Sequence, residues 1–149
     1  MNETLPQTEH LSVPESWALL SSVPSGRLAV VVDGKPEIFP VNHVVDNGTV
    51  VFRTDAGTKL LGSLGKDVAY EADGLLEAGA LVWSVVVKGR ASEVARLPKF
   101  LESLELPLVP WHTGPKPRII RIQPEEVHGR RFAPRLGRHD TSGHRTVEE

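Results

Sequence analysis

The sequence predicts a mainly β protein, a small β-barrel of six or seven antiparallel strands with two or three short helices. Runs rich in β-branched residues recur along the chain, and tight turns separate the first three of them. Asp33-Gly34 and Asn47-Gly48 each stand between two such runs, which is the sequence pattern of a β-hairpin. Strands joined directly by such turns favour an antiparallel barrel or sandwich over a parallel doubly wound sheet.

The composition restricts the class of protein. A chain of 149 residues suits a single domain with one hydrophobic core. Its formal net charge of −2 argues against a nucleic-acid partner and against binding to a membrane surface. The absence of cysteine excludes disulfides, thiol catalysis and thiolate metal sites. Because no apolar segment resembles a signal peptide or reaches the length of a membrane span, we expect a soluble cytoplasmic protein.

The expected elements follow one another closely along the chain. Helices are predicted from Pro14 to the turn at Pro24, at 59–64 and at 97–104; strands are predicted at 27–32, 37–45, 49–52, 68–72, 81–91, 119–122 and 127–132, with a loop at 73–79.

Three residues have particular consequences for these strands. Pro40 requires an edge or a bulge in its strand, and Gly89 indicates a bulge or a close approach. Pro124 is expected to separate the last two strands, the second of which would lie at an edge. We expect a flexible arm at residues 1–12, the barrel domain at 13–132 and a disordered tail at 133–149.

The end of the third strand carries the strongest candidate for a binding site. The strand ends in Arg53-Thr54, the chain turns at Asp55-Ala56-Gly57, and Thr58-Lys59 opens a segment with helical spacing. Two cations and two hydroxyls at a helix start suit an anion such as a phosphate. The alternative is a strand–turn–helix corner whose cations are solvated, and the pattern alone does not distinguish the two.

Other polar residues give weaker signals. None of the six histidines forms a short-spaced pair with another ligand residue, so no metal site is predicted, and His43 is expected to line the barrel or its site. Arg118, Arg121, Arg130 and Arg131 make the last strands basic, which is typical of solvated strand faces; the alternative is a site for an anionic substrate. No nucleophile elbow, Gly-x-Gly-x-x-Gly motif or Walker loop is present.

Several short motifs together resemble a known family. In chain order they are Gly26-Arg27-Leu28, Pro40-Val41-Asn42, Phe52-Arg53-Thr54, Gly57-Thr58-Lys59, Trp83-Ser84-Val85 and Gly89-Arg90-Ala91. Their order and spacing resemble those of the pyridoxamine 5′-phosphate oxidase-like, FMN-binding split β-barrel proteins. The resemblance spans about residues 13–132.

The resemblance implies a homodimer with two flavin sites at the subunit interface. Arg53 and Lys59 would hold the phosphate of FMN, with help from Thr54 and Thr58. The other cofactor-binding positions that it implies are Phe52, the tripeptide Pro40-Val41-Asn42 along the isoalloxazine ring, and Trp83, Ser84 and Val85 from the partner subunit.

The activity implied by the resemblance is that of an FMN-dependent oxidoreductase acting on a small molecule, with a reduced nicotinamide as a candidate donor. No side chain is an obvious general acid, so no catalytic residue is assigned and the flavin would carry the chemistry. Members that oxidise pyridoxamine 5′-phosphate have a basic C-terminal stretch that the residues after Phe132 do not resemble, which argues against that substrate. The alternatives are a flavin-binding carrier or sensor without turnover, and a relative that binds a deazaflavin or haem.

Overall fold

A computed structural model describes residues 8–54, 59–94 and 118–134 of the chain. Its elements are β1 (Glu9–Leu11), α1 (Val13–Ser21), β2 (Ser25–Val32), β3 (Lys35–Asp46), β4 (Thr49–Thr54), the short 3₁₀ turn η1 (Lys59–Ser63), β5 (Asp67–Leu76), the 3₁₀ turn η2 (Glu77–Gly79), β6 (Leu81–Val94) and β7 (Arg118–Phe132). The predicted mainly β class is confirmed. None of the helices in these ranges is long and apolar enough to cross a membrane.

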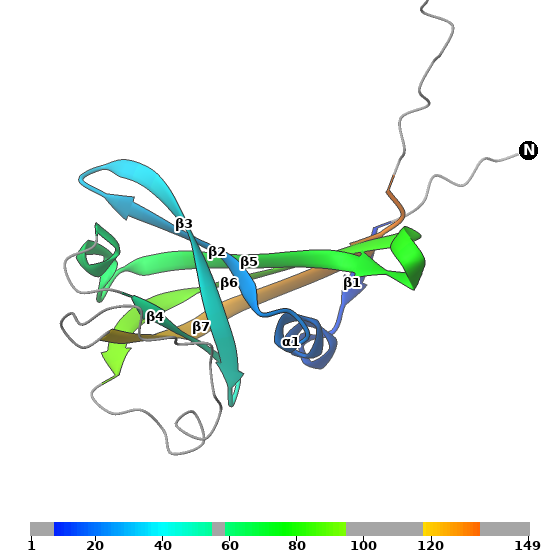
Figure 1. Cartoon of the computed structure of the whole chain (residues 1–149), viewed down its shortest axis with the longest axis horizontal. Helices are drawn as coiled ribbons and strands as arrows, with labels where there is room; N and C mark the ends of the chain where they lie inside the picture. The colour runs from blue at the N-terminus through cyan, green and yellow to red at the C-terminus, as the bar shows by residue number, and fades with distance from the viewer. Residues whose placement is uncertain (1–7, 55–58, 95–117, 135–149) are drawn as a thin grey trace, which may run out of the picture.

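The strands form one antiparallel sheet that closes into a ring. The order is β1-β7-β4-β3-β2-β5-β6, and β6 pairs again with β7. Six strands therefore complete the barrel, while β1 pairs only with the far end of β7. In this ring β3 and β6 are three strands apart in either direction, so they lie on opposite sides. Figure 1 shows β3 crossing in front of the long strands.

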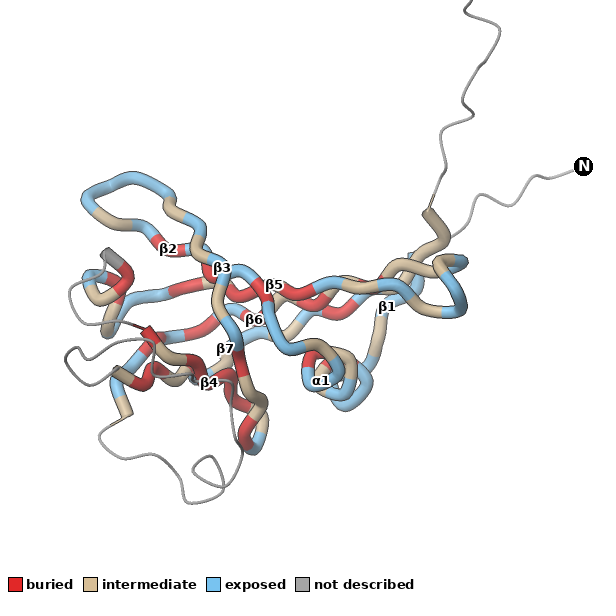
Figure 2. Tube along the Cα trace, in the orientation of Figure 1, coloured by how far each residue is buried: buried red, intermediate tan, exposed pale blue. Residues whose placement is uncertain are grey.

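The interior of the barrel is filled by alternate residues of each strand. On β2, for example, Leu28 and Val30 are buried and their neighbours are exposed, as expected where one face of a strand meets a core. The largest buried side chains are Trp83 and Tyr70. Figure 2 shows that buried residues recur along the strands of the barrel. A second, smaller cluster, Val51 and Ile119, lies on the opposite face of β4 and β7.

Both predicted hairpins are confirmed, and their backbone angles explain the residues that form them. Asp33 and Gly34 have φ values of 53° and 74°, and Asn47 and Gly48 have 46° and 69°. Two consecutive positive φ values define a type I′ turn, which suits the twist of the adjoining strands. Glycine reaches this region without strain, and Asp and Asn reach it more readily than other residues.

The predictions for Pro40 and Gly89 are also confirmed. Residues Lys35 to Asn42 of β3 pair with β2, and pairing with β4 begins only at His43, so Pro40 lies where β3 has a single neighbour. The register of β6 against β7 shifts between Lys88 and Gly89, which marks a bulge.

Three expectations about element boundaries were wrong. Residues 73–79, expected to be a loop, continue β5 to Leu76 because each of them up to that point pairs with β6. The two last strands form one strand, β7, and Pro124 pairs opposite Gly89 at the bulge, where the ladder is already disrupted. Its second half lies between β6 and β1, not at an edge.

The predicted short helix after the candidate phosphate corner is the single 3₁₀ turn η1, and residues 9–11 of the expected arm form β1. The helix expected at 97–104, the first seven residues and the tail beyond residue 134 lie outside the described residues.

Candidate functional site

Arg53 lies one residue before the end of β4, with an environment unusual for an arginine. Phe52 belongs to the barrel core, so the alternation of β4 places Arg53 on the outer face, opposite Ile119 of β7. Its Nε is shielded from solvent and has no hydrogen-bond partner in the part of the chain that the structure describes. Burial also lowers the pKa of the Arg53 guanidinium, although arginine stays protonated at any physiological pH.

A buried, charged donor without a partner is costly, so it indicates a binding site for an acceptor. The guanidinium has five N–H groups in a planar fork that matches two oxygens of a phosphate or carboxylate. An anion at the end of β4 would satisfy Nε and offset the loss of hydration.

The structure describes the rest of the predicted phosphate corner only in part. Thr54 is buried, and its side chain lies on the inward face of β4, opposite to that of Arg53. Lys59 begins η1, whose next residue, Leu60, is packed into the core and fixes the start of the turn. Thr58 and the side chain of Lys59 lie outside the described structure, so their roles remain predictions.

The tripeptide Pro40-Val41-Asn42 lies just before the point at which β3 changes partner. Pro40 and Asn42 are exposed, whereas Val41 packs against the core. On the side away from β2, no other described strand pairs with these residues. Among the described residues this edge has no strand partner, and an unpaired strand edge of this kind can bind the polar rim of a planar ligand.

An ionic cluster that the sequence analysis missed lies beside this tripeptide. Arg27 is the register partner of both Pro40 on β3 and Glu71 on β5. Its Nε donates to Glu71 Oε2 at 2.8 Å, and its Nη2 is ion-paired with Asp73. Burial raises the pKa of Glu71, and a hydrogen bond from Glu71 lowers the pKa of Asp73. The only local signal was two carboxylates at alternate positions of one strand.

The tripeptide Trp83-Ser84-Val85 is divided between the two faces of β6. Trp83 and Val85 are in the core, with 2% and 0% of their surface exposed. Ser84 is on the outer face, in register with Asp73 and Arg130. Of the three side chains, only that of Ser84 lies on the outside of the barrel. Within one chain, β2 and β5 separate Pro40 on β3 from Ser84 on β6, and Arg27, the register partner of Pro40, is ion-paired with Asp73, the register partner of Ser84.

Ion pairs account for most of the basic character of β7. Arg118 pairs with Glu93 at 2.6 Å, and the buried carboxylate of Asp46 accepts from Arg121 Nη2 at 3.0 Å. Arg131 pairs with Glu9 of β1 at 2.7 Å. These arginines hold neighbouring elements together. The described residues contain no group of three or more side chains that could hold a metal ion.

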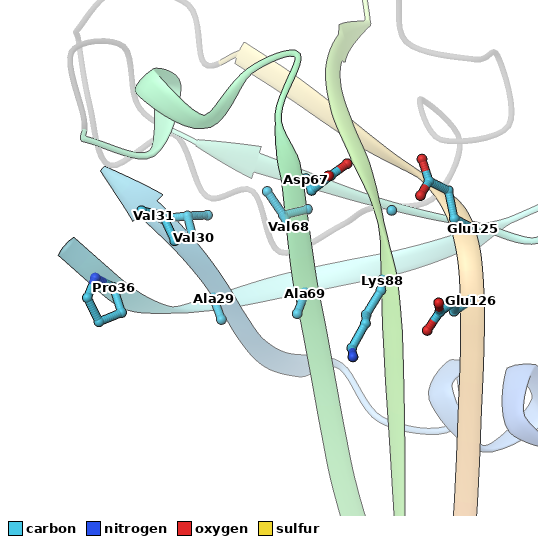
Figure 3. A pocket seen from close by; sticks show the side chains of 11 residues that line it. Ala29, Val30, Val31, Pro36, Asp67, Val68, Ala69, Lys88, Glu125 and Glu126 are labelled. Carbon is cyan, nitrogen blue, oxygen red and sulfur yellow. The ribbon is translucent and has the colours of Figure 1, made fainter. Parts of the chain in front are cut away.

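A hollow of about 400 Å³ lies on the outer face of β2, β5 and β6 (Figure 3). Its floor is apolar and includes Ala29, Val31 and Ala69, whereas Lys88 and Glu126 are at its rim. No sequence-predicted site residue lines it. Val31 and the nearby Ile38 of β3 are exposed by 56% and 67%, so this face of the barrel presents unusually large apolar side chains to solvent.

Comparison with known families accounts for all of the described elements except β1 and the last residue of β7. The family model described as pyridoxamine 5′-phosphate oxidase matches residues 12–131. The chain belongs to this pyridoxamine 5′-phosphate oxidase-like family. The matched range contains the barrel, α1 and all the candidate site residues, which confirms the resemblance identified from the sequence.

Relatives within and near this family share most of their length with the chain. The Mycobacterium tuberculosis protein Rv0080 is 37% identical over 124 residues, covering 79% of this chain and 81% of its own. The structure of an FAD-binding protein from Mycobacterium smegmatis is 36% identical, with a TM-score of 0.66 over 85% of this chain and 99% of its own. An FAD-binding protein from Mesorhizobium loti, 24% identical, has the same fold, with a TM-score of 0.72 over 87% of this chain and 100% of its own.

Proposed function

We propose that this protein binds a flavin through the FMN portion that FMN and FAD share, and that it acts as a cytoplasmic flavin-dependent oxidoreductase on a small molecule. The observation that carries the proposal is the solvent-shielded Nε of Arg53, which has no partner among the described residues. The Mycobacterium smegmatis FAD-binding protein, 36% identical, supports a flavin as the ligand. Its FAD differs from the FMN expected from sequence only beyond the first phosphate.

In this proposal the chain binds the two ends of the flavin with different elements. Arg53 binds the phosphate, assisted by Lys59 and by the hydroxyl of Thr58. The buried hydroxyl of Thr54 lies on the opposite face of β4 from Arg53 and is not part of this phosphate site. The isoalloxazine ring lies along Pro40-Val41-Asn42, where the unpaired edge of β3 offers backbone donors and acceptors to the polar side of the ring.

The ring site is completed by a second copy of the chain. Two strands, β2 and β5, separate Ser84 from Pro40 within one chain, and in this proposal Ser84 is assigned to the ring bound by the partner subunit. The buried Trp83 and Val85 keep the backbone of β6 in place on either side of it. The exposed Val31 and Ile38 give the outer face the apolar character that a homodimer interface requires.

The bound flavin supplies the electron transfer between a donor, such as a reduced nicotinamide, and a small acceptor. The chain binds the cofactor, fixes the orientation of its ring and covers part of it. The Arg27–Glu71–Asp73 cluster beside Pro40 provides fixed charges next to the ring site, which suits a polar acceptor more than an apolar one.

A titration of the purified protein with FMN and with FAD, followed by flavin fluorescence and visible absorption, tests the proposal. We expect a quenched, spectrally shifted flavin at about one per subunit. Arg53→Met removes charge-assisted hydrogen bonds of about 1.5–3 kcal/mol, so Kd should rise about 10- to 150-fold. Arg90→Met is the control, because the side chain of Arg90 is 65% exposed and its ion pair with Asp67, the one that the described residues give it, is long at 3.6 Å.

If Arg53→Met binds both flavins as tightly as the parent protein, the phosphate assignment is wrong. Turnover is tested separately, by anaerobic stopped-flow mixing of the flavin-loaded protein with NADH or NADPH and then with acceptors. Rapid reduction and rapid reoxidation are expected of an oxidoreductase. A protein that is slow in both steps is a carrier or sensor.

A further inference from the structure

We propose that the buried pair His43–Tyr70 is a positioning unit of the flavin site: it fixes the corner of β3 and so holds Pro40-Val41-Asn42 in the conformation that faces the ring. The inference rests on the flavin site proposed above. Neither residue touches the ring in this account, because both side chains lie inside the barrel wall, with 7% and 0% of their surfaces exposed.

The corner is the point at which β3 leaves one neighbour for another. Asn42 is the last residue paired with β2, and His43 is the first paired with β4. A strand that changes partner loses the continuous ladder that normally fixes its direction. The residues just before this point are those proposed to bind the ring, so their position depends on what holds residue 43.

His43 is bound at this corner by three hydrogen bonds to three other parts of the fold. Its backbone N–H donates to Pro24 O at 3.0 Å, in the link between α1 and β2. Its Nε2 donates to Leu20 O of α1 at 2.8 Å, because a carbonyl oxygen can only accept. Nδ1 is then the acceptor, and Tyr70 Oη of β5 donates to it.

This arrangement requires both side chains to be neutral, and the burial of each favours that state. Burial lowers the pKa of His43 and raises the pKa of Tyr70. The two rings meet edge to face, with centroids 5.1 Å apart and planes at 78°. Near neutral pH the pair therefore has one tautomer and one direction for each hydrogen bond.

Packing restricts the side-chain position of Tyr70 more than it restricts that of His43. A Cβ at Gly26 would lie 2.5 Å from Tyr70 Oη and 2.5 Å from Glu71 O, so the absence of a side chain there makes room for the hydroxyl. On its other side, His43 borders a hollow of about 350 Å³ between the α1–β2 link and Val45. Side-chain contacts on that side are incomplete, so the two hydrogen bonds of the imidazole, to Leu20 O and from Tyr70 Oη, determine its direction.

Tyr70→Phe tests the inference because it removes the hydroxyl and keeps the ring. Ser16→Ala is the matched control: Ser16 is fully buried in α1, and its Oγ donates to Ser12 O at 2.8 Å. Each variant loses one buried hydroxyl and its hydrogen bond, so the two should lose similar stability in urea unfolding. The two variants differ in one respect: the hydroxyl of Tyr70 is hydrogen-bonded to His43 at the corner of β3, whereas that of Ser16 is bonded within α1 and its N-terminal cap.

Two readouts are compared in the full-length parent and both variants. In the flavin-free proteins, Tyr70→Phe should exchange the amides of Val41, Asn42 and His43 at least tenfold faster than the parent, whereas Ser16→Ala should not. With FMN, Tyr70→Phe should raise Kd at least fivefold and shift the bound-flavin absorption band, whereas Ser16→Ala should keep the parent values.

Unchanged amide exchange in Tyr70→Phe would overturn the inference, whether or not flavin binds. Faster exchange with an unchanged Kd and spectrum would also overturn it, because the corner would then not be coupled to the site. An equal rise of the FMN Kd in Ser16→Ala would show that the rise in Tyr70→Phe comes from lost stability alone, and would also overturn the inference. Failure of the parent protein to bind FMN or FAD refutes the proposed function, and the exchange experiment distinguishes that result from failure of the corner itself.

Discussion

Replacement of Gly89 by alanine should disrupt the seam between β6 and β7. A Cβ at Gly89 would lie 1.9 Å from Gln123 O, whereas ordinary contact begins near 3.4 Å. The obstructing atoms belong to the backbone of Gln123 and Pro124, so they cannot rotate away. The strands must separate locally by the difference between those two distances, about 1.5 Å, which is enough to break the hydrogen bonds beside the bulge.

Two or three lost backbone hydrogen bonds at about 1 kcal/mol each give an expected destabilisation of about 2–3 kcal/mol. In a protein of this size that corresponds to a fall in Tm of roughly 5–10 °C. The assay is urea and thermal unfolding at a fixed protein concentration, since association would change the apparent stability. Gly62→Ala is the control, because the nearest atom to its added Cβ is Val32 Cγ1 at 3.7 Å. Equal stability of both variants would refute the close approach of β6 and β7 at the bulge.

Two further predictions concern buried charge. Burial lowers the pKa of His43, so below about pH 6.5 the unfolded chain takes up a proton that the folded protein does not. The free energy of unfolding should therefore fall on acidification by up to about 1.4 kcal/mol per pH unit. Urea midpoints measured from pH 7.5 to 5 should depend less steeply on pH in His43→Gln than in the parent protein, whereas the exposed His128→Gln should keep the parent slope. Arg121→Met leaves the buried Asp46 carboxylate without its cation and should destabilise by about 2 kcal/mol, whereas Arg118→Met, which breaks an exposed pair, should change the urea midpoint far less. Equal midpoints in the two arginine variants would contradict this account of Asp46.

Features that depend on local backbone chemistry could be predicted from the sequence. The two type I′ turns follow from the residues that tolerate positive φ, and the edge position of Pro40 follows from its missing N–H. The continuation of β5 beyond residue 72 could not be predicted in this way. Gly74 normally weakens a strand, but here it makes room for Trp83, whose Nε1 would lie 2.6 Å from an added Cβ. The residue that explains Gly74 is therefore on a different strand, β6, and is not a neighbour in the sequence.

In the candidate site, too, the residues set by local sequence could be predicted and those set by long-range contacts could not. Arg53 could be singled out from spacing alone because the residues of the phosphate corner are close together in the sequence. The His43–Tyr70 hydrogen bond joins residues 27 positions apart, and the Arg27–Glu71 bond joins residues 44 positions apart. Such pairs are created by the closure of the barrel, and no local pattern in a single sequence predicts them.

The central claim, that Arg53 binds a flavin phosphate, is tested most directly by comparing FMN with riboflavin, which lacks the phosphate. Kd is measured for both ligands with the parent protein and with Arg53→Met. The account predicts that the parent binds FMN at least tenfold more tightly than riboflavin and that Arg53→Met removes most of this preference while leaving riboflavin affinity unchanged. An equal preference for FMN in both proteins would contradict the account, because the phosphate would then be bound elsewhere.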